Sequence, residues 1–348
     1  MSIEARTFGT MTDGRNVTLF TITNKNRLSA SVTDLGAAWV SMLAPDRDGK
    51  LVDVILGYDD AAGYLSDAPH LGAVVGRVAN RTGNAAFTLN GINYALGKND
   101  GENNLHSGPD YYDKRLWQAA PVGEDTVVFF LNSPDGDQGY PGNAKITVKY
   151  TLTEENTVEI TYMIICDQDT PFNMTNHAYF NLAGHNAGNI GTHVMQICAD
   201  FFTPSDAASI TTGEIRPVEK TPMDFRIPKE IGRDIDAEYD QLLQAAGYDH
   251  NWCLNHLPGV YSLAANAADK TSGRAMSVYT DLPGVQFYTA NFLGGERGKG
   301  GAIYERRGAF CLETQMYPDA INKPQFASPI VKAGETRMTK TGFHFYTE

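Results

Sequence analysis

The chain has 348 residues, of which 42% are hydrophobic and 20% charged, so it can bury a sizeable core and is neither disordered nor collagen-like. Asp and Glu outnumber Lys and Arg by 41 to 28, which gives a net charge of -13. A surface of this charge repels phosphate groups, which argues against nucleic acid or an anionic membrane as a partner and is compatible with a neutral polar ligand.

The N-terminal residues and the cysteines indicate the compartment. Met1–Thr10 lacks the basic stretch and apolar run of a signal peptide. No apolar run approaches the roughly 20 residues that span a bilayer. The four cysteines lie far apart in the sequence and form no CxxC pair: Cys166, Cys198, Cys253 and Cys311. We therefore expect free thiols, no membrane association and a cytoplasmic location.

In the first half of the chain, alternating apolar and polar residues predict β-strands. Asn90-Gly91 is a tight-turn signal that divides Ala85–Leu96 into a hairpin. Lys145–Leu152 and Thr157–Ile164 alternate strictly and are joined by a short polar turn, so they predict a second hairpin. Further strands are expected at Val17–Thr23, Leu28–Val32 and Thr126–Leu131.

The second half of the chain continues the same pattern. Helical spacing is clear mainly at Ile235–Ala246. Many short strands with few helices predict an all-β fold, an antiparallel sandwich or barrel. No linker, repeat or shift in composition divides the chain, so we expect a single domain over residues 1–348. The strands expected here are His193–Phe201, Arg274–Thr280, Val285–Asn291, Phe310–Met316 and Thr339–Tyr346.

Familiar cofactor motifs are absent from the sequence. Gly294–Gly301 is glycine-rich, but its spacing fits neither a P-loop nor a dinucleotide-binding turn, so we expect a mobile surface loop. None of the eight histidines shows a short metal-ligand spacing. The sequence thus gives no local signal for a metal or an organic cofactor and leaves open a metal site assembled from distant residues. Five histidines are assigned ordinary surface or hydrogen-bonding roles: His70, His185, His193, His256 and His344.

Two histidines lie in segments that suit ligand binding. His106 is flanked by Asn, Ser and Gly, which mark a loop, and it either contacts a ligand or stabilises that loop. His177 lies where polar and aromatic residues interleave, from Asn173 to Leu182 and including Tyr179. Such a segment suits a ligand with many hydroxyl groups, and it equally suits a buried histidine whose hydrogen bonds are satisfied.

Two carboxylates are further candidates. Asp249 follows Gly247, and it either faces a ligand or caps backbone amides between a helix and a strand. Glu313 points away from the face that Phe310 and Leu312 share, so it lies either on a solvated outer face or in a concave site on the sheet. The pattern leaves both alternatives open.

Three more polar residues are candidates for the same kind of site. Asn80 and Arg81 follow an apolar run, where an arginine is usually a surface ion-pair partner. Gln286 lies opposite the face that Val285 and Phe287 share.

Taken together, six segments of the chain resemble the aldose 1-epimerase (galactose mutarotase) family. They occur in the family's order across most of the sequence. Four positions depart from the residues common in that family: Ser107 and Ala290 replace Gly, Ala178 replaces Ser and Met316 replaces His. The segments are HLGAVVGRVANR (70–81), NNLHSG (103–108), NMTNHAYFNL (173–182), YDHNW (248–252), VQFYTANFL (285–293) and CLETQMYPDA (311–320).

The resemblance implies a large antiparallel β-supersandwich and a mutarotase that interconverts the α and β anomers of aldohexoses. It implies that Glu313 is the general base and His177 the general acid of ring opening and closure. We expect the two opposite charges to stabilise each other. No metal or organic cofactor is implied. The residues expected to hold the sugar are Asn80, Arg81, His106, Tyr179, Asp249 and Gln286.

Three alternatives stay open. A glycoside hydrolase would use Asp249 and Glu313 as its pair of carboxylates. A sugar-binding protein without turnover would use the same pocket. A hexose-6-phosphate 1-epimerase would need a basic pocket, for which the sequence offers only Arg306-Arg307 and Arg77 with Arg81. The sequence does not decide the preferred aldose, nor whether the protein is a monomer or a homodimer.

Overall fold

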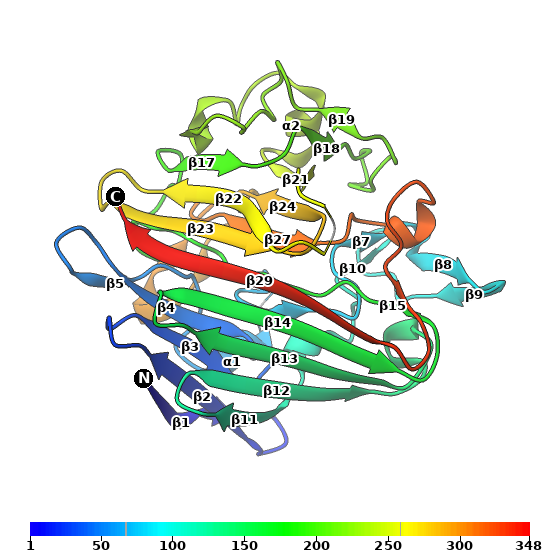
Figure 1. Cartoon of the computed structure of the whole chain (residues 1–348), viewed down its shortest axis with the longest axis horizontal. Coiled ribbons are helices and arrows are strands. Elements are labelled where there is room, and N and C mark those ends of the chain that lie inside the picture. The colour runs from blue at the N-terminus through cyan, green and yellow to red at the C-terminus, as the bar shows by residue number, and fades with distance from the viewer. Residues whose placement is uncertain (67, 258) are drawn as a thin grey trace.

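The largest element of the fold is a nine-stranded antiparallel sheet, seen in a computed structural model that describes residues 1–348 except 67 and 258. The C-terminal strand β29 lies in its middle, between β14 and β23 (Figure 1). In order across the sheet the strands are β11 (Gln118–Val122), β12 (Thr126–Ser133), β13 (Ala144–Leu152), β14 (Thr157–Cys166), β29 (Thr336–Thr347), β23 (Arg274–Thr280), β22 (Ser262–Ala268), β17 (Val194–Ile197) and β20 (Lys229–Glu230).

Two five-stranded antiparallel sheets accompany it. The N-terminal sheet contains β1 (Ser2–Thr10), β2 (Asn16–Thr23), β3 (Ser29–Thr33), β4 (Trp39–Pro45) and β5 (Leu51–Asp53). The other, which carries most of the candidate site, contains β19 (Arg216–Pro217), β18 (Phe201–Thr203), β21 (Asp249–Cys253), β24 (Gly284–Tyr288) and β27 (Cys311–Gln315).

Outside the three large sheets, the described residues form short strand pairs and two short α-helices. The paired strands are β6 (Val74–Val75) with β16 (Thr175–Asn176), β7 (Arg81–Thr82) with β10 (Asn104–Leu105), β8 (Ala86–Leu89) with β9 (Ile92–Ala95), β15 (Thr170–Pro171) with β28 (Ile330–Val331), and β25 (Glu296–Arg297) with β26 (Ile303–Tyr304). The α-helices are α1 (Ala61–Ser66) and α2 (Asp240–Ala245). Within the part of the chain described, neither helix has the length and apolar character needed to cross a membrane.

One buried cluster joins the three large sheets. It contains Phe20 from β2, Val148 from β13, and Trp252 and Phe287 from the sheet that carries the site. In β13 and β14 buried residues alternate with more exposed ones, as expected for strands with one face on the core. The all-β antiparallel fold is thereby confirmed. The single domain over residues 1–348 stays a prediction, which the shared core supports.

Both hairpins predicted from the sequence are present. Asn90 and Gly91 form the turn between β8 and β9 with φ of 52° and 78°, as this type of tight turn requires. The predicted hairpin of Lys145–Leu152 and Thr157–Ile164 is β13 and β14.

Two predictions about other segments were wrong. The predicted helix at Ile235–Ala246 covers only Asp240–Ala245, because Ile235 is buried in a loop and not on a helix face. The predicted strand His193–Phe201 is broken, since β17 ends at Ile197 and Phe201 begins a strand of another sheet. The spacing of apolar residues indicates which side chains are buried, but a side chain can be buried without belonging to a helix or a strand.

The loop Gly294–Gly301 is not a free surface loop. Lys299 folds inward, where its Nζ donates to the carbonyl oxygens of Val40 at 2.9 Å and Ile55 at 2.6 Å and pairs with Asp53 at 2.5 Å. Three contacts to the N-terminal half anchor the loop, so this lysine is committed to the fold and not to a ligand.

Candidate functional site

The eight residues singled out from the sequence all line one pocket, with a volume of about 290 Å³. They come from segments far apart in the chain, which the sheets bring together. The eight are Asn80, Arg81, His106, His177, Tyr179, Asp249, Gln286 and Glu313. The structure thus places them in a single site, while the role of each stays a prediction.

Three adjacent strands supply one side of the pocket, called here the strand wall (Asp249, Gln286 and Glu313). In the register of β24 and β27, Gln286 lies directly opposite Glu313. Asp249, two residues from the partner of Gln286 on β21, projects from the same face. Gln286 Nε2 donates to Asp249 Oδ1 at 2.7 Å, so the wall is fixed by the sheet and by its own side chains.

Glu313 faces the pocket and not solvent. Its exposed fraction is 3%, which excludes the solvated outer face that the strand pattern left open. Among the described residues its Oε2 atom has no hydrogen-bond partner. Burial, together with the charge of Asp249, raises the pKa of Glu313 well above that of an ordinary glutamate. A buried carboxyl with a free oxygen is suited to exchanging a proton with a ligand.

His177 lies beside this carboxyl. Its Nε2 is 3.7 Å from Glu313 Oε1, and its ring stacks on Tyr179 with centroids 5.0 Å apart. Burial, followed by the charge of His70, lowers the pKa of His177 to about 3. That two opposite charges here stabilise each other stays a prediction, and burial acts against it by shifting each pKa toward the neutral form. Burial thus favours the neutral form of each side chain.

A second part of the pocket lining comes from the ends of the short strands β7 and β10 and the loops beside them, and is called here the loop wall (Asn80, Arg81 and His106). Asn80 N donates to His106 Nδ1 at 3.1 Å, and His106 N donates to Asn80 O at 3.0 Å. Because Nδ1 accepts, neutral His106 carries its proton on Nε2 and is a hydrogen-bond donor there. Arg81 pairs with Asp100 at 2.7 Å, so the surface ion pair expected of this arginine exists at the rim of the pocket.

The backbone of the loop wall is strained. Asn80, His106 and Ser107 have φ of 61°, 55° and 60°, a left-handed region in which a side chain costs free energy. Ser107, which stands where the related family often has Gly, is fully buried, and its Oγ accepts from Val78 N at 2.9 Å. This hydrogen bond ties the His106 loop to the segment that carries Asn80.

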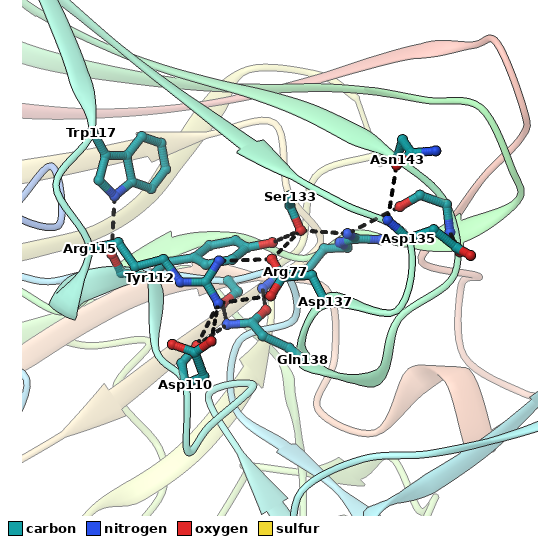
Figure 2. Close-up of polar contacts among 12 residues, drawn as sticks. Arg77, Asp110, Tyr112, Arg115, Trp117, Ser133, Asp135, Asp137, Gln138 and Asn143 are labelled. Atoms are coloured by element: carbon teal, nitrogen blue, oxygen red, sulfur yellow. Dashed lines mark hydrogen bonds and ion pairs between the residues drawn. The ribbon is translucent and has the colours of Figure 1, made fainter.

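A buried arginine lies beneath the same segment. Arg77 is 0% exposed and donates to the Ser133 hydroxyl at 2.6 Å and to the Pro141 carbonyl at 2.7 Å. Figure 2 shows Arg77, Tyr112 and Asp137 meeting at Ser133. Arg77 is therefore a support of the loop wall and is unavailable to a ligand in the pocket.

Sequence reasoning missed several residues that also line the pocket. Tyr288 and Phe292 lie within one of the quoted segments, which was the only signal for them. His70, assigned an ordinary role, is hydrogen bonded to Asp113 as such a role requires, yet it also lines the pocket. The remaining missed residues are Ala68, Pro69, Leu105 and Tyr111.

A possible cation site overlaps the pocket. One ligand atom from each of His106, His177 and Glu313 lies within 4.8 Å of the others. Two imidazoles and a carboxylate are a donor set that a divalent transition metal accepts. Short sequence spacing could not reveal this group, because its members come from three distant segments.

Fold and pocket together define the class of protein. A buried carboxyl and an imidazole, surrounded by amide, guanidinium and aromatic side chains on an antiparallel β-fold, suit acid–base chemistry on a small polyhydroxylated molecule. The chain belongs to the aldose 1-epimerase family, whose family model matches residues 18–344. It is an enzyme, a carbohydrate epimerase of the isomerase class.

Individual relatives agree with this assignment. The chain is 41% identical over 346 residues to galactose mutarotase of Mus musculus, covering 99% of each chain. It is 36% identical over 338 residues to aldose 1-epimerase of Escherichia coli K12, covering 97% of each. Among solved structures, an aldose epimerase homologue from C. elegans superposes with a TM-score of 0.87 at 29% identity, covering 94% of this chain and 98% of the other.

Proposed function

We propose that the protein interconverts the α and β anomers of aldohexoses such as D-galactose and D-glucose. The observation that carries the proposal is the pair of Glu313 and His177, with Nε2 and Oε1 3.7 Å apart in a pocket of about 290 Å³. Ring opening of a cyclic hemiacetal needs one group that takes a proton and one that gives it. The printed names of the relatives, galactose mutarotase and aldose 1-epimerase, support the same reaction.

In the proposed mechanism Glu313, as carboxylate, takes the proton of the C1 hydroxyl. His177 gives a proton to the ring oxygen, the bond between C1 and that oxygen breaks, and an open aldehyde forms. Half a turn about C1–C2 presents the other face of the carbonyl. The two residues then exchange roles as the ring closes, so no proton is gained or lost over the cycle.

The other residues hold the sugar while C1 rotates. His106, with its Nε2 proton, is suited to donate to the oxygen that gains charge on ring opening. Asp249 and Gln286 form a hydrogen-bonded acceptor and donor pair on the strand wall, and Arg81 and Asn80 line the same pocket. Polar groups fixed on both sides confine motion to the reacting end. Tyr179 contributes through its stack on His177.

A sugar phosphate is a poorer fit than a neutral hexose. Arg81 is the only Lys or Arg among the described residues that line the pocket, where it faces Asp249 and Glu313. The other basic candidates are engaged elsewhere, since Arg307 pairs with Asp236 and Arg306 donates to the Ala246 carbonyl. A dianionic phosphate would therefore meet one cationic side chain, and that side chain is already paired with Asp100.

Two further expectations accompany the proposal. A cytoplasmic location is supported by four unpaired cysteines, as in a reducing compartment. The prediction of a monomer or a homodimer is unchanged.

Polarimetry tests the proposed function directly. Freshly dissolved α-D-galactose and α-D-glucose should reach their equilibrium rotation faster with the purified protein than in buffer alone, at a rate proportional to protein concentration. Rates measured over a range of sugar concentrations give kcat/KM for each sugar, and the sugar with the higher kcat/KM is the preferred aldose. An unchanged rate of mutarotation for both, with sugar binding intact, would favour the binding protein without turnover. Release of the aglycone from a glycoside would favour the hydrolase.

A further inference from the structure

A third histidine, His70, lines the pocket and has no part in the acid–base step. It lies between α1 and β6 with a left-handed φ of 61°. The carbonyl of the preceding Pro69 accepts a hydrogen bond from the Tyr179 hydroxyl at 3.0 Å. The turn is thus fastened to a residue that stacks on His177. The position of His70 is therefore set by the same structure that sets the catalytic pair.

A buried carboxylate orients the ring of His70. Its Nδ1 lies 2.9 Å from Oδ2 of Asp113, whose side chain is 7% exposed. Burial alone would raise the pKa of Asp113, but the hydrogen bond from His70 and the charges of His70 and Lys114 hold it below the usual value. An ionised Asp113 accepts the hydrogen of Nδ1. Among the described residues, Nε2 of His70 has no hydrogen-bond partner.

Ring contacts on its other sides leave His70 little freedom. Its centroid lies 4.7 Å from that of Tyr111, 5.5 Å from His106 and 6.5 Å from His177. Unlike those of His106 and His177, its nitrogens are not in the group of ligand atoms around Glu313. A polar atom held this firmly at the wall of the pocket, and away from Glu313, is suited to recognise a part of the ligand other than the reacting centre.

We propose that His70 is a substrate-contacting residue whose Nε2 forms a hydrogen bond with a sugar hydroxyl other than the one at C1, and that Asp113 is the positioning residue that orients it. This inference rests on the proposed function. It makes the contact between His70 and the sugar a determinant of which aldose is bound, because a site built to bind a hydroxyl discriminates against sugars that lack it.

Two substitutions of His70 separate this contact from a structural role. In His70→Asn the amide nitrogen can replace Nδ1 and keep the bond to Asp113, but nothing replaces Nε2. In His70→Gln the amide reaches toward the position of Nε2. We expect His70→Asn to raise KM for the preferred hexose about 3- to 10-fold with kcat within about 2-fold, and His70→Gln to recover part of that loss.

A matched control is His185→Asn, since His185 is also half-buried and bonded through Nδ1, to the Tyr304 hydroxyl at 3.0 Å, but lies outside the pocket. It should leave KM unchanged. Asp113→Asn, which keeps an acceptor but removes the charge, should raise KM less than His70→Asn does. If His70→Asn and His185→Asn have equal KM values, or if His70→Asn lowers only kcat, the proposal is overturned.

Deoxy sugars identify the contacted group. Wild type and His70→Asn are compared with the parent hexose and with its 2-deoxy, 3-deoxy, 4-deoxy and 6-deoxy derivatives. For the derivative that lacks the contacted hydroxyl, the two proteins should have the same KM. For the other sugars, the KM of His70→Asn should remain higher than that of wild type by the same factor as for the parent hexose. A ratio that is the same for every sugar would contradict the contact. Failure of the proposed function is distinguishable, because wild type would then not accelerate mutarotation of any of them.

Discussion

The strand wall and the loop wall hold their side chains by different means. Asp249, Gln286 and Glu313 project from paired strands, so the sheet ladder fixes their spacing before any side chain contributes. Asn80 and His106 lie on left-handed backbone held by side chains beneath it. The proposed base, Glu313, thus lies on the side whose spacing the strand pairing sets. The precision of the loop wall depends on residues that never touch the ligand.

The largest expected effect comes from the strand wall. Glu313→Gln keeps size and hydrogen-bonding capacity but removes the base, so kcat should fall by about 10²–10⁴. Unfolding should be no easier than in wild type, because the change removes a buried carboxyl that lies near Asp249. Polarimetry and thermal unfolding measure the two outcomes. Glu335→Gln, at an exposed turn, is the matched control. More than about a tenth of the wild-type kcat in Glu313→Gln would remove Glu313 from this role.

The pH dependence of kcat/KM tests the two proposed catalytic residues, Glu313 and His177, together. With the pKa of Glu313 raised and that of His177 lowered to about 3, the pair carries one proton between those two values. The reactive form, with Glu313 ionised and His177 protonated, also carries one proton. Wild-type kcat/KM should therefore fall as the pH rises through the raised pKa of Glu313.

His177→Gln should reverse the direction in which kcat/KM changes with pH. Only Glu313 then titrates and it must be ionised, so the remaining activity, about 10²–10⁴ lower, should rise over the same pH range. The measurement is kcat/KM for both proteins from about pH 4 to 10, with the rate in buffer subtracted. Parallel profiles would show that the two residues do not share a proton in catalysis.

A smaller effect tests the anchoring of the loop wall. Ser107→Ala removes the hydrogen bonds of the hydroxyl with Val78 N, Val78 O and the Tyr140 hydroxyl but keeps the strained φ of 60°, so we expect a loss of about 1–3 kcal/mol in the free energy of unfolding. Ser107→Gly loses the same hydrogen bonds but removes the strain, so it should lose less. Urea unfolding compares them, with exposed Ser328→Ala as control. A more stable Ala variant than Gly variant would show that strain is not the deciding factor.

The smallest expected effect is that of a chelator. Because the proposed chemistry needs only protons, EDTA should leave kcat/KM unchanged within error. Added Zn²⁺ should inhibit in competition with the sugar, since His106, His177 and Glu313 offer it ligand atoms within 4.8 Å of one another. Activity lost in EDTA and restored by a divalent ion would mean that this group is a metal centre of the enzyme.

The contrast between paired strands and loops also separates what could be predicted from the sequence from what could not. β13 and β14 were predicted almost to the residue, because one face meets the core and the other is more exposed. β27 is buried along its whole length, so alternation could not say whether Glu313 faced solvent or a pocket. For the loop wall, the motifs pointed to His106, but nothing in the pattern distinguished His70 from a surface histidine.

The sequence by itself determined the regularly alternating strands such as β13 and β14, the turn at Asn90-Gly91 and the identity of the candidate residues, because periodicity and turn chemistry are local and six ordered segments are specific to a family. The tertiary structure decided which charges are buried together. The low pKa of His177, the raised pKa of Glu313 and the bond between His70 and Asp113 all depend on distances between segments remote in the chain. Desolvation and Coulomb interactions follow separation in space, which no local pattern records.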